Sequence, residues 1–151
     1  MVEHLKIRIW LPENEWHGCI SETPWVLKTA DGRFLMQNSP HFAKGISFLD
    51  EVELVEKDGE LVFSKVIKSS GHATYRISLK KETTRAQFLQ RWADLENLGC
   101  TFEESDFLLP PLFAVDVPPS TNIDKVYSLL EQGEIDCIWE FEEGNFPRTN
   151  H

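Results

Sequence analysis

Apolar and polar residues alternate along the first half of the chain in a pattern typical of short strands. Every second residue from Leu5 to Leu11 is apolar, which is the period of a strand with one buried face. Asp31-Gly32 and Asp58-Gly59 each lie between apolar runs, and Asp-Gly favours a tight hairpin turn. No helical period separates these turns, so the pattern predicts a small, strongly bent sheet or barrel.

The second half of the chain has the pattern of helices placed between strands. Thr84 and Gln87 have capping-box spacing, in which two side chains satisfy free backbone N–H groups at a helix start. The apolar residues that follow share one helical face: Phe88, Trp92, Leu95 and Leu98. Gly99 can end the helix in the left-handed conformation. We therefore predict a helix over residues 84–98.

A second helix is predicted over residues 121–132. Ser120 or Thr121 can cap its start, and Gly133 can end it. The apolar positions between these residues have helical spacing: Ile123, Val126, Tyr127 and Leu130. Strand patterns lie before, between and after the two helices, which gives the order β-α-β-β-α-β. This is the order of the ferredoxin-like fold, with both helices on one face of an antiparallel sheet.

These patterns together predict an α+β fold in which the two halves pack against each other. We expect a β-rich, barrel-like region over residues 1–70, a ferredoxin-like region over residues 71–146 and a tail over residues 147–151. The 151 residues suffice for a real hydrophobic core. There is no apolar run of membrane-spanning length and no apolar signal region, so we expect a cytoplasmic protein. Three widely spaced cysteines predict reduced, buried thiols rather than disulfides or a metal site.

Negative charge is concentrated in the last third of the chain. Residues 99–147 hold eleven acids and one base and carry −10, whereas residues 1–98 carry −1. A field of this kind steers a positive partner and repels nucleic-acid phosphates. We therefore expect a basic protein partner, with no role for nucleic acid or a membrane.

The densest acids lie at the end of the predicted second helix and along the last strand. Like charges near a helix C-terminus are unfavourable, which indicates a use beyond solubility. Trp139 lies among them and can supply the apolar anchor of an interface, as can Phe107 or Phe146. The candidate partner-binding residues are Glu103, Glu104, Asp106, Glu131, Glu134, Asp136, Trp139, Glu140, Glu142 and Glu143.

The small size and the acidic surface favour an immunity protein or antitoxin, which would cover the basic cleft of a toxin domain. Alternatives are a regulatory or structural oligomer, and a small enzyme or ligand-binding module that uses His72 as a general base. A structural histidine that satisfies buried backbone groups is the simpler interpretation of His72. The residues of this candidate ligand site are Asn38, Asp50, Ser70, His72 and Arg76. No phosphate-binding loop or metal-ligand spacing is present, so we expect no catalysis, cofactor or metal.

Several strings resemble, in order, those of a bacterial family of small uncharacterised proteins. They are Asn38-Ser39-Pro40-His41-Phe42-Ala43-Lys44-Gly45-Ile46-Ser47, Ser70-Gly71-His72-Ala73-Thr74-Tyr75-Arg76, Ala114-Val115-Asp116-Val117-Pro118-Pro119 and Trp139-Glu140-Phe141-Glu142-Glu143-Gly144. The resemblance spans about residues 25–144. It implies a bacterial cytoplasmic protein and supplies neither an activity nor a catalytic residue.

Overall fold

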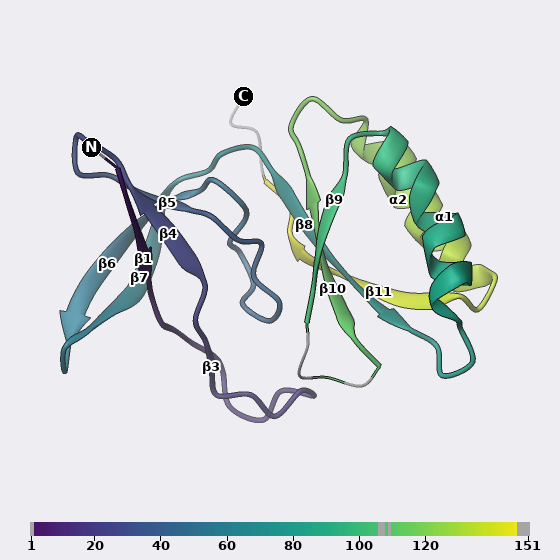
Figure 1. Cartoon of the computed structure of the whole chain (residues 1–151), viewed down its shortest axis with the longest axis horizontal. Helices are drawn as coiled ribbons and strands as arrows, with labels where there is room; N and C mark the ends of the chain where they lie inside the picture. The colour runs from purple at the N-terminus through teal and green to yellow at the C-terminus, as the bar shows by residue number, and fades with distance from the viewer. Residues whose placement is uncertain (1, 106–107, 109, 148–151) are drawn as a thin grey trace.

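The chain forms two larger β-sheets that lie side by side and a small two-stranded sheet, with two helices on the outer face of the second larger sheet (Figure 1). This arrangement comes from a computed structural model, which describes residues 2–105, 108 and 110–147. The fold is mixed, mostly β, and both sheets are open. No helix in the described part of the chain is long and apolar enough to cross a membrane.

The first sheet contains both predicted hairpins. Its strand order is β1-β4-β5-β6-β7. These strands are β1 (Glu3–Lys6), β4 (Trp25–Lys28), β5 (Phe34–Met36), β6 (Glu51–Lys57) and β7 (Glu60–Lys68). The turn at Asp31-Gly32 joins β4 to β5, and the turn at Asp58-Gly59 joins β6 to β7. Asp58 and Gly59 both have positive φ, as expected for the hairpin turn that Asp-Gly favours. Both hairpin predictions are confirmed.

The barrel expected in the first half is not closed. Its edge strands β1 and β7 are connected only through Arg8, which makes an isolated bridge to Val62. Arg8 donates its N–H to the Leu61 carbonyl over 2.9 Å and accepts from the Phe63 N–H over 2.9 Å. The next residues turn away into β2 (Ile9–Trp10), which pairs with β3 (Ser21–Glu22). One residue is too short a ladder to close a barrel.

The second sheet has the strand order β11-β8-β10-β9, and all its neighbouring strands are antiparallel. Its strands are β8 (Ala73–Leu79), β9 (Thr101–Glu104), β10 (Leu112–Val117) and β11 (Trp139–Asn145). Helix α1 (Arg85–Asn97) connects β8 to β9, and α2 (Ile123–Ile135) connects β10 to β11. Both helices therefore cover one face of the sheet (Figure 1), and the opposite face is turned towards the first half.

The helix ends agree with the predictions for α1 but not for α2. Thr84 and Gln87 form the predicted capping box, and Gly99 has the positive φ of a helix terminator. Helix α2 is capped instead by Asn122, whose Oδ1 accepts the Lys125 N–H over 3.2 Å. Gly133 lies inside α2 rather than at its end. A Cβ there would lie 2.2 Å from the indole of Trp139, so this glycine permits close packing.

Each half of the molecule has its own hydrophobic cluster, and the two halves meet through mostly polar contacts. Val26 and Met36 are buried in the first cluster, and Phe88 and Trp139 in the second. Leu112 of β10 belongs to the first cluster, so the second half contributes to that core. The thiols do not all follow the prediction of burial: the three described cysteines are free, Cys100 is buried, Cys19 is half-buried and Cys137 is exposed.

Candidate functional site

Four of the predicted acids surround one groove with an aromatic floor. The groove has a volume of about 430 Å³ and lies between α2 and the edge strand β11. Its acids are Glu131, Glu134, Glu142 and Glu143, and its other lining residues are Tyr75, Tyr127, Ile135 and Phe141. We call this set the acidic groove. Tyr127 is 46% exposed, and Ile135 is 66% exposed, so apolar surface is accessible between the carboxylates.

The local structure explains why these side chains gather. Tyr127, Glu131, Glu134 and Ile135 follow one another at helical spacing and so form a stripe beside the buried face of α2. Glu143 of β11 is the register partner of Tyr75 on β8. The ring of Phe141 meets the ring of Tyr127 edge to face, with 5.6 Å between ring centroids. The aromatic rings of α2 and β11 thereby form the floor of the acidic groove.

Three of the four groove acids have no cationic partner. No ion pair within the described ranges involves Glu131, Glu134 or Glu143. Glu134 accepts only a long hydrogen bond, 3.4 Å, from the Phe141 N–H. Burial and, after it, the charge of Glu143 raise the pKa of Tyr75 to about 12. Lys80, which is paired with Glu140, also attracts Glu134 at longer range. The negative charge of the groove is therefore compensated only in part, and the apolar floor beside it strengthens its attraction for a cation.

The other predicted acids are already paired. Glu104 lies 2.9 Å from Arg85, Asp136 lies 2.6 Å from Arg91, and Glu140 lies 2.7 Å from Lys80. All three bases belong to residues 1–98, whose own net charge is only −1. These acids therefore contribute less local field than their number indicates.

Two predicted partner-binding residues have structural positions instead. Trp139 is 1% exposed and donates its indole N–H to the Leu130 carbonyl over 2.8 Å, so it is a core residue and not an exposed anchor. Glu103 accepts hydrogen bonds from the Asn38 side chain, over 2.6 Å, and from the Ser39 N–H, over 2.7 Å. Asp106, and the alternative anchor Phe107, lie outside the described residues.

The candidate ligand site around His72 is a set of hydrogen bonds at the junction of the two halves. His72 Nδ1 lies 2.8 Å from Asp116 Oδ1. Burial raises the pKa of Asp116 above its ordinary range, although the hydrogen bond with His72 opposes this shift. The Ser70 hydroxyl donates to the Phe48 carbonyl over 2.7 Å. It is therefore not directed to the His72 ring, as a nucleophile would have to be.

Asp50 and Asn38 also hold backbone groups in place. Asp50 accepts the N–H groups of Ser47 and Ser70 over 2.9 and 2.8 Å, and Asn38 Oδ1 accepts the Trp25 N–H over 2.7 Å. The contacts of Asp50 join the segment after β5 to the residues before β8, and the contact of Asn38 joins that segment to β4. No group of three or more His, Cys, Asp or Glu side chains in the described part of the chain is placed to hold a metal ion.

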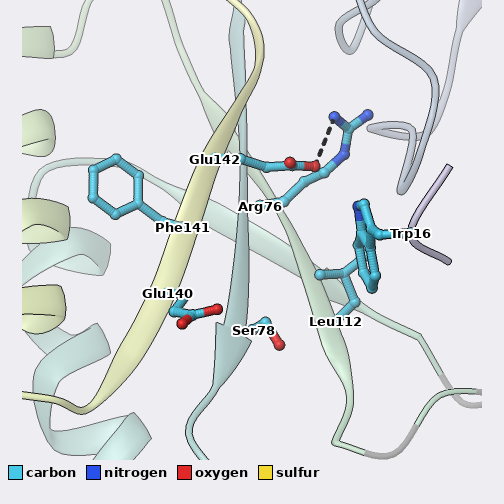
Figure 2. Close-up of a pocket in the computed structure, with 7 residues that line it drawn as sticks. All are labelled: Trp16, Arg76, Ser78, Leu112, Glu140, Phe141 and Glu142. Carbon is cyan, nitrogen blue, oxygen red and sulfur yellow. Dashed lines mark ion pairs between the residues drawn. The ribbon is translucent and has the colours of Figure 1, made fainter.

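Arg76, also a member of that predicted set, lies beside a pocket on the second sheet. It lies on β8 with a fully buried side chain, and Figure 2 shows its guanidinium next to Glu142 and above Trp16. Its Nη2 donates to the Ala43 carbonyl, and its Nη1 lies 3.6 Å from Glu142 Oε1. Burial lowers the pKa of Arg76, and the nearby Glu142 carboxylate partly opposes that shift.

The apolar floor of the acidic groove is the feature that sequence reasoning missed. Apolar residues at helical spacing, among them Tyr127, indicate a buried helix face, and this pattern alone does not show that one of them is exposed. The signal available was the second stripe, in which Glu131 and Glu134 share helical spacing with Tyr127 and Ile135.

Comparisons with known proteins give a family and a fold but no activity. Residues 22–141 match the domain of unknown function DUF4265, and the chain belongs to this family. No curated protein matches the chain. A solved structure described as "Novel crystal structure of a hypothetical protein from Neisseria gonorrhoeae" is similar to it, with a TM-score of 0.77 and 22% sequence identity. The similarity covers 97% of this chain and 99% of that one, and at this identity it shows the fold alone.

Proposed function

We propose that this member of the DUF4265 family is an inhibitory binding protein, an immunity protein or antitoxin, whose acidic groove receives a basic segment of a toxin domain. The observation that carries the proposal is the position of Glu131, Glu134 and Glu143. They surround accessible aromatic surface and have no cation of their own within the described ranges. We also infer that the second sheet and its helices form a ferredoxin-like unit, because their strand order is β11-β8-β10-β9.

The groove has the chemistry to bind a lysine or arginine side chain of a partner. Carboxylates at its rim can accept charge-assisted hydrogen bonds from an ammonium or guanidinium group. The faces of Tyr127 and Phe141 attract a cation through the negative side of the aromatic ring and bury the aliphatic stem of the same side chain. A groove about 430 Å³ in volume accepts one or two such side chains rather than a whole domain.

The net charge of −10 and the groove act at different distances. The overall field of the protein steers a basic partner during encounter, and this effect declines with salt. The groove then selects a cation that is placed correctly for its rim and floor. A toxin that acts on nucleic acid has a basic cleft, so carboxylates inserted there would occupy the sites of substrate phosphates.

The test compares two triple variants with the same change in net charge. In the groove variant, Glu131, Glu134 and Glu143 become Gln. In the control variant, Glu104 and Glu140 become Gln and Asp136 becomes Asn. Every acid in the control has an ion-pair partner on this chain, so the two variants differ in where the charge is lost and not in how much.

The partner is identified by co-purification from the native cell, and its association with each variant is then measured by stopped-flow mixing over a range of salt. We expect the groove variant to associate at least about tenfold more slowly at low salt, and the control less than about threefold more slowly. The difference should shrink as salt screens the charges. Equal losses would mean that only the total charge matters, and undiminished association of a folded groove variant would place the interface elsewhere.

A further inference from the structure

Arg76 has a buried guanidinium whose hydrogen-bonding capacity is only partly used by the described residues, since Nη2 donates to the Ala43 carbonyl. Its side chain is fully buried. Neither Nε nor Nη1 has a hydrogen-bond partner among the described residues, and the ion pair of Nη1 with Glu142 is long at 3.6 Å. Buried polar groups are almost always satisfied, because an unpaired one loses its hydration without compensation. A charged group in this condition indicates a site that is completed by another molecule.

The surrounding backbone is arranged to keep this guanidinium in one position. Gly144 lies over it, and a Cβ at Gly144 would be 2.8 Å from Nη1. The register of β11 shifts between Glu143 and Asn145, which places this glycine at an irregularity in the strand. The Gly45 N–H donates to the Gly144 carbonyl over 2.9 Å. Arg76 is thus fixed from both halves of the molecule before any ligand arrives, which lowers the entropy lost on binding.

A pocket of about 260 Å³ lies beside Arg76 on the face of the second sheet that is opposite the helices. Figure 2 shows Trp16 and Leu112 on one side of it and Glu140 and Glu142 on the other. Trp16 comes from the segment between β2 and β3 and is 63% exposed, so its ring offers an accessible apolar wall. The pocket therefore combines a flat apolar surface with one buried cation.

We propose that this pocket binds a small aromatic carboxylate, with the carboxylate on Arg76 and the ring against Trp16. The Glu142 side chain is 39% exposed and holds the guanidinium only at 3.6 Å, so a ligand carboxylate can replace it while Glu142 moves into water. The exchange replaces one carboxylate by another beside the guanidinium, and Glu22, whose charge also acts on Arg76, stays in place. Glu140 adds little repulsion because it is paired with Lys80 at 2.7 Å. A phosphate dianion would bring an uncompensated second charge next to the two glutamates, which disfavours it.

The experiment measures binding of 2-naphthoate to the full chain by isothermal titration calorimetry, with 2-naphthamide as the neutral analogue of the same shape. We expect the carboxylate to bind at least about fivefold more tightly than the amide, because it alone makes a charge-assisted hydrogen bond to the guanidinium. Glu142→Gln removes the competing carboxylate and keeps the buried arginine, so it should tighten naphthoate binding by at least about threefold.

Trp16 and Trp10 are both exposed, so replacing each of them by alanine tests whether the ring of the ligand lies against Trp16. Trp16→Ala should weaken naphthoate binding at least about fivefold, whereas Trp10→Ala should leave it unchanged. Trp10 is 56% exposed and does not line the pocket, so both variants should fold. Equal affinity for naphthoate and naphthamide, equal effects of the two tryptophan variants, or no binding to either the wild type or Glu142→Gln would each overturn the proposal.

Discussion

Replacing Gly133 by alanine tests how α2 is seated against β11, and with it the shape of the acidic groove. By helix propensity alone the change should stabilise the folded protein, because alanine is about 1 kcal/mol more favourable than glycine inside a helix. The structure predicts the opposite sign. The new Cβ would lie 2.2 Å from the Trp139 ring. Because the backbone fixes the position of an alanine Cβ, only a shift of the helix or of the indole can relieve this clash.

The expected size follows from three contributions. Forcing a methyl group into a filled core costs about 2 kcal/mol. Moving the indole away weakens its 2.8 Å hydrogen bond to the Leu130 carbonyl, which is worth about 1 kcal/mol. The gain in helix propensity offsets about 1 kcal/mol. Gly133→Ala should therefore lower the free energy of unfolding by about 2 kcal/mol, or lower the Tm by about 4–8 °C.

The assay is urea unfolding followed by tryptophan fluorescence, with Ser128→Ala as the control. Ser128 is an exposed position of the same helix, and its replacement should change stability by less than about 0.5 kcal/mol. A Gly133→Ala protein that is more stable than wild type by about 1 kcal/mol would refute the packing of Trp139 against α2. If instead the loss appears, binding to the basic partner should also weaken, since Glu131 and Glu134 move with the helix.

Two further variants test the contacts between the halves. Glu103→Ala leaves the Asn38 side chain and the buried Ser39 N–H without their acceptor and should cost about 1–3 kcal/mol in urea unfolding, with a smaller loss for Glu103→Gln, which keeps an acceptor. Asp116→Asn tests the raised pKa of that carboxyl. The folded state holds the proton of the Asp116 carboxyl more tightly than the unfolded state does. The free energy of unfolding of the wild type should therefore fall, relative to that of Asp116→Asn, as the pH is raised from about 4. A difference between the two proteins that is constant from about pH 4 to about pH 7 would contradict the shift.

The sequence predicts local structure well where one residue pair determines the geometry. The hairpin at Asp58-Gly59 and the capping box of Thr84 with Gln87 were both predicted, and both are present. In each case the signal and the structure lie within four residues, so no tertiary contact can override it. The prediction that Gly133 ends the second helix is wrong, because the contact that determines its role does not lie within four residues. Its role depends on Trp139, six residues further on and on another element, and a helix-ending glycine and a packing glycine are identical in sequence.

Whether the first sheet closes into a barrel could not be predicted, for a related reason. Alternation over Leu5 to Leu11 indicates strand and a buried face, but not which strand each residue pairs with. In the structure this run divides between β1, the single bridge of Arg8 to Val62, and β2. The chain thus pairs with three different strands in turn within a few residues, which a period-two pattern does not record.

The candidate site shows what a count of charges along the sequence leaves out. The division at residue 98 assigns −10 to one part and −1 to the other, yet Lys80, Arg85 and Arg91 lie before that division and pair with acids after it. Charge that is close in sequence is not thereby close in space, because β11 and α1 bring distant segments together. Once these pairs are set aside, Glu131, Glu134 and Glu143 of the acidic groove are among the acids that have no ion pair within the described ranges. Under the proposed function we therefore expect a basic partner to be recognised by where it places one or two cations and not by its total charge, and the matched pair of triple variants tests this expectation where a general reversal of charge does not.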